Sequence, residues 1–160
     1  MSMGSEFTHL DSSGAARMVD VSAKNVSART ATAAGFVRLS ARTVELLRAG
    51  DMPKGDALAV ARIAGIMAAK RTPDLVPLCH PIALHGVEVV LEVEDAGVAI
   101  TAQVRTADRT GVEMEALTSV SVAALALIDM VKAVDPAAVV TDVRVLEKTG
   151  GKTGAWHRDA

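Results

Sequence analysis

Regular alternation of apolar and polar residues predicts a β-hairpin in the middle of the chain. In "GVEVVLEVE", residues 86–94, apolar side chains occupy every second position and glutamates fill most of the others. Residues 98–106, "VAITAQVRT", have the same period of two. Because successive side chains of a strand point to opposite faces, each stretch predicts a strand with one packed and one solvated face. The residues "DAG" between them predict a hairpin turn.

Helical spacing occurs on both sides of this hairpin. The sequence "DALAVARIAGIMAAKR" is apolar almost all round, which predicts a helix that is buried on most sides. Ser40 and Asp56 are typical of helix starts, and Gly50 is typical of a helix end. Three prolines predict irregular structure over 72–82. The patterns predict helices over 40–50, 56–71 and 112–135, and two further strands over 29–40 and 138–151.

The order of these elements indicates the fold class. A strand, two helices, a hairpin, a long helix and a final strand predict an α+β fold, a ferredoxin-like antiparallel sheet with helices packed on one face. We see no repeats or linkers, so residues 1–160 are expected to form a single domain. The start "MSMGSEF" lacks the positive and apolar regions of a signal peptide. About residues 1–8 are therefore expected to be disordered or left over from expression cloning.

The core has few aromatic rings available to it. Half of the residues are hydrophobic, but aromatic residues make up 2% of the chain and tyrosine is absent. A core of alanine, valine, leucine, isoleucine and methionine buries less area per residue than a core with large rings. The composition therefore predicts a homo-oligomer, in which the chain completes its burial against copies of itself.

Charge and cysteine content narrow the expected partners and location. The net charge is −2 and the pI is near 6.1, so there is no basic field that would predict nucleic acid as a partner. The longest apolar run, about "VAALALI", is far shorter than the ~20 residues of a membrane span, so no membrane partner is expected. The single cysteine, Cys79, excludes an internal disulfide and fits a reducing cytoplasm. We therefore expect a cytoplasmic protein.

Acidic and basic residues lie at both ends of the long helical pattern. Asp129 and Lys132, in "AALALIDMVKAVD", are three residues apart and share a helix face. Glu113 and Glu115 lie where the positive end of the helix favours charged carboxylates, so helix-start electrostatics is one interpretation and an active site is the other. Fourteen residues separate Glu115 from Asp129, which is about 21 Å along a helix. One chain cannot direct both carboxylates at one atom, but a neighbouring subunit could unite them.

The tail "KTGGKTG" has the composition of a phosphate-binding loop. The Walker pattern requires glycine where Leu146 stands, so a nucleoside triphosphatase is excluded. The glycine N–H groups, together with Lys148 and Lys152, could still bind an anionic oxygen. The alternative is that this segment is a flexible, solvated chain end. Lys54 and Arg62 could also face an anion, or could be a solvated lysine and an arginine whose stem lies along apolar surface.

The segment "PLCHP" places Cys79 beside His80. Adjacent side chains of an extended segment point in opposite directions, so these two residues are poor partners as nucleophile and base. The other histidines are His9, His85 and His157, in no ligand spacing, so no zinc site is predicted. We expect Cys79 to be a small buried hydrophobe. His80, which lies between two prolines, is either a functional ring or a hydrogen-bonded structural one.

Four blocks of the sequence together resemble one family. They are "MVDVSAK", "KGDALAVARIAGIMAAKRTPDLVPLCHPI", "GVEMEALTSVSVAALALIDMVKAVD" and "EKTGGKTG", in this order. The blocks closely resemble the molybdenum cofactor biosynthesis protein C (MoaC) family, the cyclic pyranopterin monophosphate synthases. The resemblance covers roughly residues 8–156.

The resemblance implies an activity and an assembly. Members of the family convert 3',8-cyclo-7,8-dihydro-GTP, which a radical enzyme makes from GTP, into cyclic pyranopterin monophosphate, and they release pyrophosphate. It implies a lyase that uses acid–base catalysis on a small purine-nucleotide-derived substrate. It also implies a hexamer, a trimer of dimers, whose active sites lie where subunits meet. No cofactor is expected, although magnesium could accompany the triphosphate.

Carried over by motif, the resemblance assigns catalysis to Lys54, Asp129 and Lys132. The substrate-binding residues that it implies are Leu78, Cys79, His80, Glu113, Met114, Glu115, Lys148 and Lys152, with no metal ligand. The family usually has tyrosine before the aspartate and often cysteine after the following methionine, whereas this chain has Ile128 and Val131. These changes remove one phenolic hydrogen bond near the site.

We interpret Asp129 and Lys132 as a partly buried acid–base couple. Burial alone would raise the pKa of the carboxylate and lower the pKa of the ammonium group, and the attraction between the two charges would oppose both shifts. On this hypothesis Lys132 is a general acid, and Asp129 orients it or accepts a proton. Lys54 and the tail lysines would bind the triphosphate, while His80 and the two glutamates would bind the base and sugar.

Two other functions stay open at this stage. The first is a non-catalytic, ferredoxin-like regulatory module that binds a small ligand between subunits, in which the charged residues form interface salt bridges. The second is a scaffold for other cofactor-assembly proteins. Incubation with the dihydro-GTP compound distinguishes the module from the enzyme, because only the enzyme releases pyrophosphate. A catalytically dead point mutant that still rescues a deletion strain would favour the scaffold.

Overall fold

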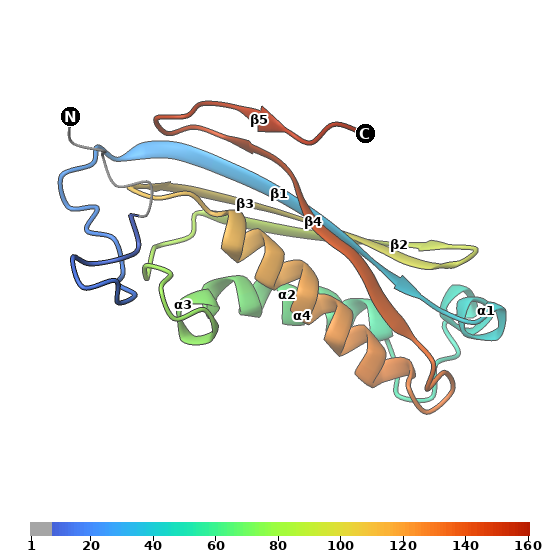
Figure 1. Cartoon of the computed structure of the whole chain (residues 1–160). Helices are drawn as coiled ribbons and strands as arrows, with labels where there is room; N and C mark the ends of the chain where they lie inside the picture. The colour runs from blue at the N-terminus through green and yellow to red at the C-terminus, as the bar shows by residue number, and fades with distance from the viewer. Residues whose placement is uncertain (1–7) are drawn as a thin grey trace.

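The computed structural model describes residues 8–160, so the prediction for residues 1–8 lies outside the described residues except for Thr8. In chain order the elements are β1 (Ser27–Arg38), α1 (Ala41–Ala49), α2 (Ala57–Lys70), α3 (Thr72–Leu75), β2 (Gly86–Glu94), β3 (Gly97–Asp108), α4 (Glu113–Val131), β4 (Val139–Thr149) and β5 (Trp156–His157). Figure 1 shows the sheet above and the helices α2 and α4 side by side beneath it.

The five strands form one antiparallel sheet in the order β2-β3-β1-β4-β5. The long helix α4 packs on β1, β3 and β4, and α2 packs on β2 and against α4. The prediction of an α+β, ferredoxin-like fold with helices on one face is therefore confirmed. Figure 1 also shows that α4 crosses beneath the sheet for its whole length.

The locally encoded elements lie where the sequence predicted them. The alternating residues of β2 and β3 bury one face, including Leu91 and its register partner Ile100. The hydroxyl of Ser40 accepts the Thr43 N–H at the start of α1, and Gly50 ends that helix with φ of 74°. Left-handed φ values cost glycine little, which is why it ends helices.

Three predictions about element boundaries are wrong. The proline-rich stretch 72–82 was expected to be irregular, but it begins with α3, because a helix tolerates proline in its first turn. The final strand ends at Thr149, and a two-residue strand, β5, follows the tail. The predicted helix over 112–135 ends at Val131, and Asp135 beyond it accepts hydrogen bonds from the backbone of Ser40 and the hydroxyl of Thr43.

Small side chains let the two long helices approach closely. A Cβ added at Gly65 of α2 would lie 3.0 Å from the Ser119 carbonyl oxygen and 3.1 Å from the Ala123 Cβ of α4. The inward side of α2 consists of Ala57, Ala61, Gly65, Ala68 and Ala69. The core therefore reaches close packing with almost no aromatic side chains.

The helix α4 is long and apolar enough to cross a membrane by length and composition alone, with a mean hydropathy of 1.7 over its window. A core helix of a folded domain has the same two properties. In this structure the buried side of α4 packs against three strands and α2, so its apolar character is accounted for by the core.

We predict that Gly65→Val lowers the free energy of unfolding by about 1–3 kcal/mol, the usual cost of overpacking. The added methyl groups would have to displace the Ser119 backbone or the Ala123 side chain. Urea denaturation at one fixed protein concentration measures the change. Ala59→Val, at a partly buried position of the same helix, controls for valine in a helix; equal stability of Gly65→Val and wild type would contradict the close helix contact.

Candidate functional site

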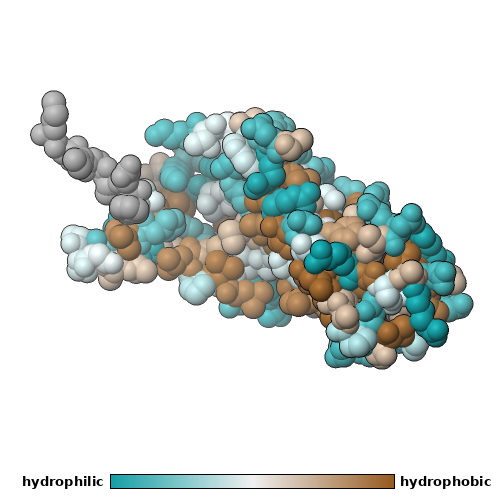
Figure 2. Space-filling model, turned by 45° about the vertical axis from the view of Figure 1, so that its right-hand side comes forward, coloured by the Kyte–Doolittle hydropathy of each residue, from teal (hydrophilic) through white to brown (hydrophobic). Residues whose placement is uncertain are grey.

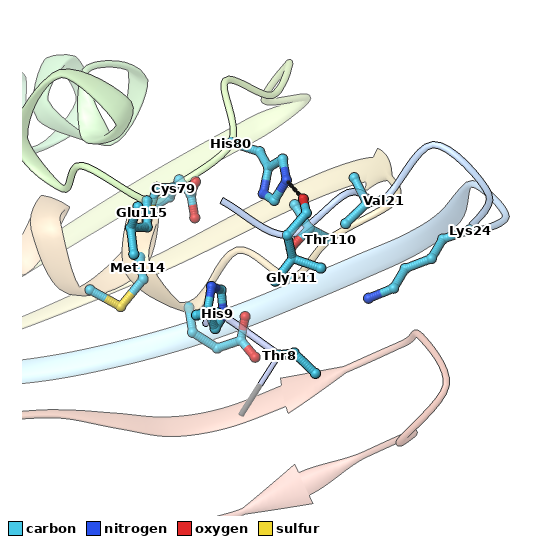
Figure 3. Close-up of a pocket in the computed structure, with 13 residues that line it drawn as sticks. Thr8, His9, Val21, Lys24, Cys79, His80, Thr110, Gly111, Met114 and Glu115 are labelled. Atoms are coloured by element: carbon cyan, nitrogen blue, oxygen red, sulfur yellow. Dashed lines mark hydrogen bonds between the residues drawn. The ribbon is translucent and has the colours of Figure 1, made fainter. Parts of the chain in front are cut away.

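A cavity of about 370 Å³ lies at the N-terminal end of α4 (Figure 3). Two sequence motifs that are far apart in the chain meet there, "LCH" after α3 and "EME" at the start of α4. Six of the predicted substrate-binding residues line this cavity: Leu78, Cys79, His80, Glu113, Met114 and Glu115. The N-terminal segment contributes Val19, Val21 and Lys24 to its wall.

The ring of His80 is held by the backbone of the N-terminal segment. Its Nε2 lies 2.5 Å from the carbonyl oxygen of Val19, and Figure 3 shows this contact at the edge of the cavity. Because a carbonyl oxygen only accepts, Nε2–H must be the donor. The contact therefore fixes the orientation of the ring and leaves Nδ1 as the ring nitrogen that can bind a ligand.

The carboxyl group of Glu115 is the most strongly perturbed group of the cavity. The residue is 3% exposed, and its Oε2 has no hydrogen-bond partner within residues 8–160. Burial raises the pKa of Glu115 to about 7, and the nearby charge of Glu113 adds to the shift. The expectation that the helix start favours its charged form is therefore wrong, because the cost of desolvation exceeds the effect of the helix end. A carboxyl with this pKa can give or take a proton near neutral pH.

The thiol of Cys79 stays protonated beside this carboxyl. Partial burial raises the pKa of Cys79, and the charge of Glu115 raises it further. A thiol with a raised pKa is a poor nucleophile. The prediction of a buried hydrophobe is wrong in one respect, because the residue is only partly buried and lines the cavity.

An ion pair connects the tail to this end of α4. The Nζ of Lys148 on β4 lies 2.9 Å from Oε1 of Glu113, and both side chains are roughly two-thirds buried. The other tail lysine, Lys152, lines a second cavity of about 650 Å³ together with Lys24 and Arg29. The tail is packed on β1 rather than extended into solvent, since a Cβ at Gly150 would lie 2.1 Å from the Ala28 carbonyl oxygen.

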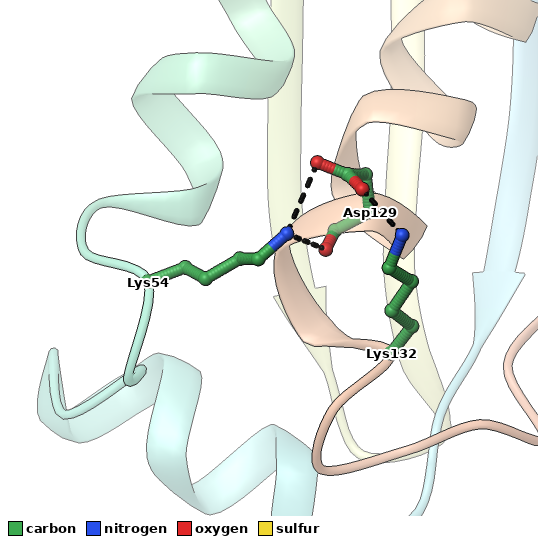
Figure 4. A network of polar contacts seen from close by, with 3 residues as sticks. All are labelled: Lys54, Asp129 and Lys132. Carbon is green, nitrogen blue, oxygen red and sulfur yellow. Dashed lines mark hydrogen bonds and ion pairs between the residues drawn. The ribbon is translucent and has the colours of Figure 1, made fainter.

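The second charged group lies at the opposite end of α4 (Figure 4). One carboxylate oxygen of Asp129 lies 2.7 Å from Nζ of Lys132, and the other lies 3.3 Å from Nζ of Lys54. Lys54 also donates to the backbone carbonyl of Asp129 at 3.0 Å. Hydrogen bonds from Lys132 and then from Lys54 lower the pKa of Asp129. The aspartate is therefore an ionised anchor that holds two ammonium groups close together.

The predicted burial of the Asp129–Lys132 pair is wrong for this single chain. The side chains of Asp129 and Lys132 are 56% and 58% exposed. Sharing a helix face was correctly predicted from their spacing, but that face points away from the sheet. Burial of this pair would have to come from something other than residues 8–160.

The helix α4 separates the two groups. It is continuous from Glu113 to Val131, so the fourteen residues between Glu115 and Asp129 correspond to about 21 Å. The structure therefore brings together the residues of the cavity, and separately brings together Lys54, Asp129 and Lys132. It does not bring the two groups to each other within one chain.

Other candidate residues have simpler explanations. Arg62 donates from Nε to the Val89 carbonyl at 3.3 Å, so it secures α2 to β2 rather than facing an anion. Within residues 8–160, no group of three or more His, Cys, Asp or Glu side chains is placed to hold a metal ion.

Sequence reasoning missed the contribution of the N-terminal segment and of β1. Val19, Lys24 and Arg29 line the cavities or hold His80, although none has a periodic or spacing signal. The only available signal was the short apolar stretch "MVDVSAK" within a polar region, and it did not indicate which residues face the site.

Comparisons with known proteins cover nearly the whole chain. A family model described as "MoaC family" matches residues 18–151. The chain is 69% identical over 151 residues to "Cyclic pyranopterin monophosphate synthase" of Streptomyces coelicolor, which covers 94% of this chain and 89% of that protein. It is 68% identical over 154 residues to the protein with that name from a Nocardioides species, with 94% of each chain covered. It is 61% identical over 153 residues to "Cyclic pyranopterin monophosphate synthase 2" of Mycobacterium tuberculosis, with 96% and 92% covered.

We predict that Glu115 makes folding stability depend on pH. Its pKa rises from 4.5 to about 7 on folding, so the folded protein binds this proton more tightly than the unfolded chain. This contribution to stability is fully present below pH 4.5 and is lost as the pH rises through about 7. In Glu115→Gln the contribution is absent, so the stability of wild type relative to this variant should fall by roughly 2–3 kcal/mol between about pH 5 and pH 8.

Denaturation of both proteins across this pH range measures the difference. Glu88→Gln, which removes an exposed carboxylate from β2, is the matched control for the loss of one negative charge. Parallel stability curves for wild type and Glu115→Gln would contradict the raised pKa.

Proposed function

The chain belongs to the MoaC family, as its four sequence blocks predicted, and we propose that it makes cyclic pyranopterin monophosphate for molybdenum cofactor biosynthesis. The observation that carries this function is the 69% identity, over 94% of the chain, to a protein named cyclic pyranopterin monophosphate synthase. The substrate of this reaction is 3',8-cyclo-7,8-dihydro-GTP. The chain acts as a lyase, and its single cysteine supports a cytoplasmic location.

The reaction requires proton transfers and involves no net oxidation. The five-membered ring of the purine opens, and a new ring closes to form the pterin. A hydroxyl oxygen derived from the ribose then forms a bond to the α-phosphorus. The bond between the α-phosphorus and the bridging oxygen breaks, pyrophosphate leaves, and the proton of the hydroxyl passes to a base. The protein must therefore supply groups that exchange protons near neutral pH and cations for the phosphates.

The cavity at the start of α4 suits the base and sugar of this substrate. Glu115, with a pKa of about 7, is suited to give and take protons during ring opening and closure. His80 presents Nδ1 because its Nε2–H is held by Val19. Glu113 and Lys148 form an ion pair at the edge of this cavity. Polar groups of a bound substrate can therefore replace this ion pair with contacts of their own to Glu113 and Lys148.

The second cavity suits the triphosphate. Lys24, Arg29 and Lys152 line it, and Lys24 also lines the first cavity, so the two spaces adjoin. Three cations around such a space favour a ligand with several negative charges. A magnesium ion, where one is used, would arrive with the triphosphate rather than in a carboxylate cage.

The group at the far end of α4 acts on the substrate from another chain. Asp129 is ionised and holds Lys54 and Lys132, so it works as an orienter, and Lys132 serves as the general acid. Because about 21 Å separates these residues from Glu115, a complete site needs two copies. Docking of a second copy would also supply the burial that the pair lacks in a single chain.

An exposed apolar stripe supports this assembly. Val60, Ile63 and Met67 of α2 lie three and four residues apart and are 44%, 56% and 57% exposed, and Leu125 of α4 is 60% exposed. Figure 2 shows hydrophobic side chains along the lower half of the molecule, where Figure 1 places the helices. Apolar stripes of this kind are typical of surfaces that bind other chains. We propose the hexamer of the family, a trimer of dimers, as the assembly that covers it.

A non-catalytic ligand-binding module is the second candidate function. It would account for the ion pairs, because salt bridges alone say little about activity. It does not account for Glu115, which is buried beside a cavity with one carboxyl oxygen that has no hydrogen-bond partner within residues 8–160, at a cost to folding. A binding module gains nothing from such a group, whereas a proton-transfer enzyme does.

We predict that the purified protein releases pyrophosphate from 3',8-cyclo-7,8-dihydro-GTP and that Lys132→Ala lowers the turnover number at least ~100-fold, the usual contribution of a general acid. A coupled pyrophosphate assay measures both. Arg48→Ala removes a cation that pairs with Asp95 and contacts neither charged group, and it serves as the control. Binding of the compound without pyrophosphate release would favour the regulatory module, and a Lys132→Ala turnover within a few-fold of wild type would exclude the catalytic pair.

We also predict that two inactive variants restore activity together. Glu115→Gln and Lys132→Ala change opposite ends of α4. In a mixed oligomer, some sites therefore combine an unchanged Glu115 from one variant with an unchanged Lys132 from the other. Random mixing should restore about a quarter of the sites. Co-expression with two different tags, followed by tandem purification and the pyrophosphate assay, measures this recovery. A mixture no more active than the two variants alone would mean that each site is built from one chain.

A further inference from the structure

The C-terminal strand β5 places the only tryptophan of the chain beside a predicted site residue. Trp156 pairs with Lys148 in the register of β4 and β5, and His157 pairs with Glu147. Figure 1 shows β5 folded back along the end of β4. Directly paired residues of an antiparallel ladder have their side chains on the same face, with Cβ atoms about 5 Å apart. The indole and the lysine stem are therefore immediate neighbours.

The ring and the lysine share one surface cleft with Glu113. The cleft is lined by Glu113, Val145, Lys148, Trp156 and Arg158. The Nζ of Lys148 lies 2.9 Å from Oε1 of Glu113, so the lysine spans from the β5 side of the cleft to the start of α4. Trp156, Lys148 and Glu113 therefore all border the same cleft.

Arg158 holds the indole ring in this place. The backbone N–H of Arg158 donates to the Leu146 carbonyl at 2.8 Å, and its Nε donates to the Val145 carbonyl at 2.7 Å. Its guanidinium carbon lies 5.5 Å from the centroid of the Trp156 ring, within the range of a cation–π contact. One ring face is thereby fixed by a side chain that is itself anchored to β4.

We propose that Trp156 is a positioning residue that holds Lys148 at Glu113, at the edge of the cavity that the base and sugar would occupy. A lysine side chain has four flexible carbons and loses substantial rotamer entropy when it is ordered. A flat ring fixed beside the stem removes many of these rotamers before the substrate binds, so less entropy is lost on binding. No other described residue supplies an aromatic ring to this cleft. This inference rests on the proposed function, because its kinetic test uses pyrophosphate release.

A double-mutant cycle tests the proposal. Trp156→Ala should lower kcat/KM about 10-fold in the wild-type background but less than about 2-fold in Lys148→Ala, because its effect passes through Lys148. The losses of kcat/KM caused by Trp156→Ala and by Lys152→Ala should multiply, because Lys152 lines a different cavity. Trp156→Phe, which keeps a flat ring, should retain most of the kcat/KM. Asp159→Asn, just beyond β5, is the control for changes in the exposed end.

A second measurement does not depend on activity. Because Trp156 is the only tryptophan, its fluorescence reports on this cleft alone. Lys148→Ala should shift the emission to longer wavelength, since the ring loses the lysine stem and gains water, whereas Lys152→Ala should leave it unchanged.

The two measurements separate the possible failures. Effects of Trp156→Ala and Lys148→Ala that multiply fully, or an emission spectrum that Lys148→Ala does not change, would overturn the proposal. Fully multiplying effects would instead indicate that the indole acts on the substrate directly. If the wild type releases no pyrophosphate, the proposed function fails, and the fluorescence comparison still decides whether the ring holds Lys148.

Discussion

One unbroken helix fixes the distance between the two charged groups of this protein. The helix α4 has neither glycine nor proline between Glu113 and Val131, and its inner face is packed against the sheet and α2. It therefore cannot bend or shorten enough to bring its ends to one substrate. Every function that needs both Glu115 and Asp129 must be completed by a second chain. The geometry of a single helix thus determines which assemblies can carry out the chemistry.

The pKa of a carboxyl group is shifted in opposite directions at the two ends of α4. At the start of α4, burial desolvates Glu115, one of whose carboxyl oxygens has no hydrogen-bond partner within residues 8–160, and its pKa rises to about 7. At the other end, two lysines surround Asp129 and lower its pKa. Carboxyl groups with pKa values that differ in this way suit different roles, one as a proton carrier and one as a permanent charge. The chain obtains both kinds of carboxyl group from ordinary acidic residues by burying one and leaving the other at the surface.

The sequence predicted those features that depend on neighbouring residues. The β2–β3 hairpin followed from alternation, and the start of α1 followed from Ser40 as a cap. The perturbed carboxyl was missed, because the desolvation of Glu115 depends on the whole fold around the start of α4. The contact of Val19 with His80 joins residues 61 positions apart, which no local pattern reports. Spacing showed that Asp129 and Lys132 share a face but could not show that this face is left uncovered.

The helix α2 has its small side chains on the buried side and its larger apolar side chains on the exposed side. Its inner side is alanine and glycine, while Val60, Ile63 and Met67 point outward. The small inner residues let α2 approach α4 so closely that Gly65 has little room for a side chain. This close approach packs the core without large aromatic rings. The larger apolar surfaces are then available on the outside, on the same helix layer that exposes Asp129. Burial of this layer against another copy would therefore stabilise the proposed assembly and desolvate the charged group at once, which would link the aromatic-poor composition to the proposed shared site.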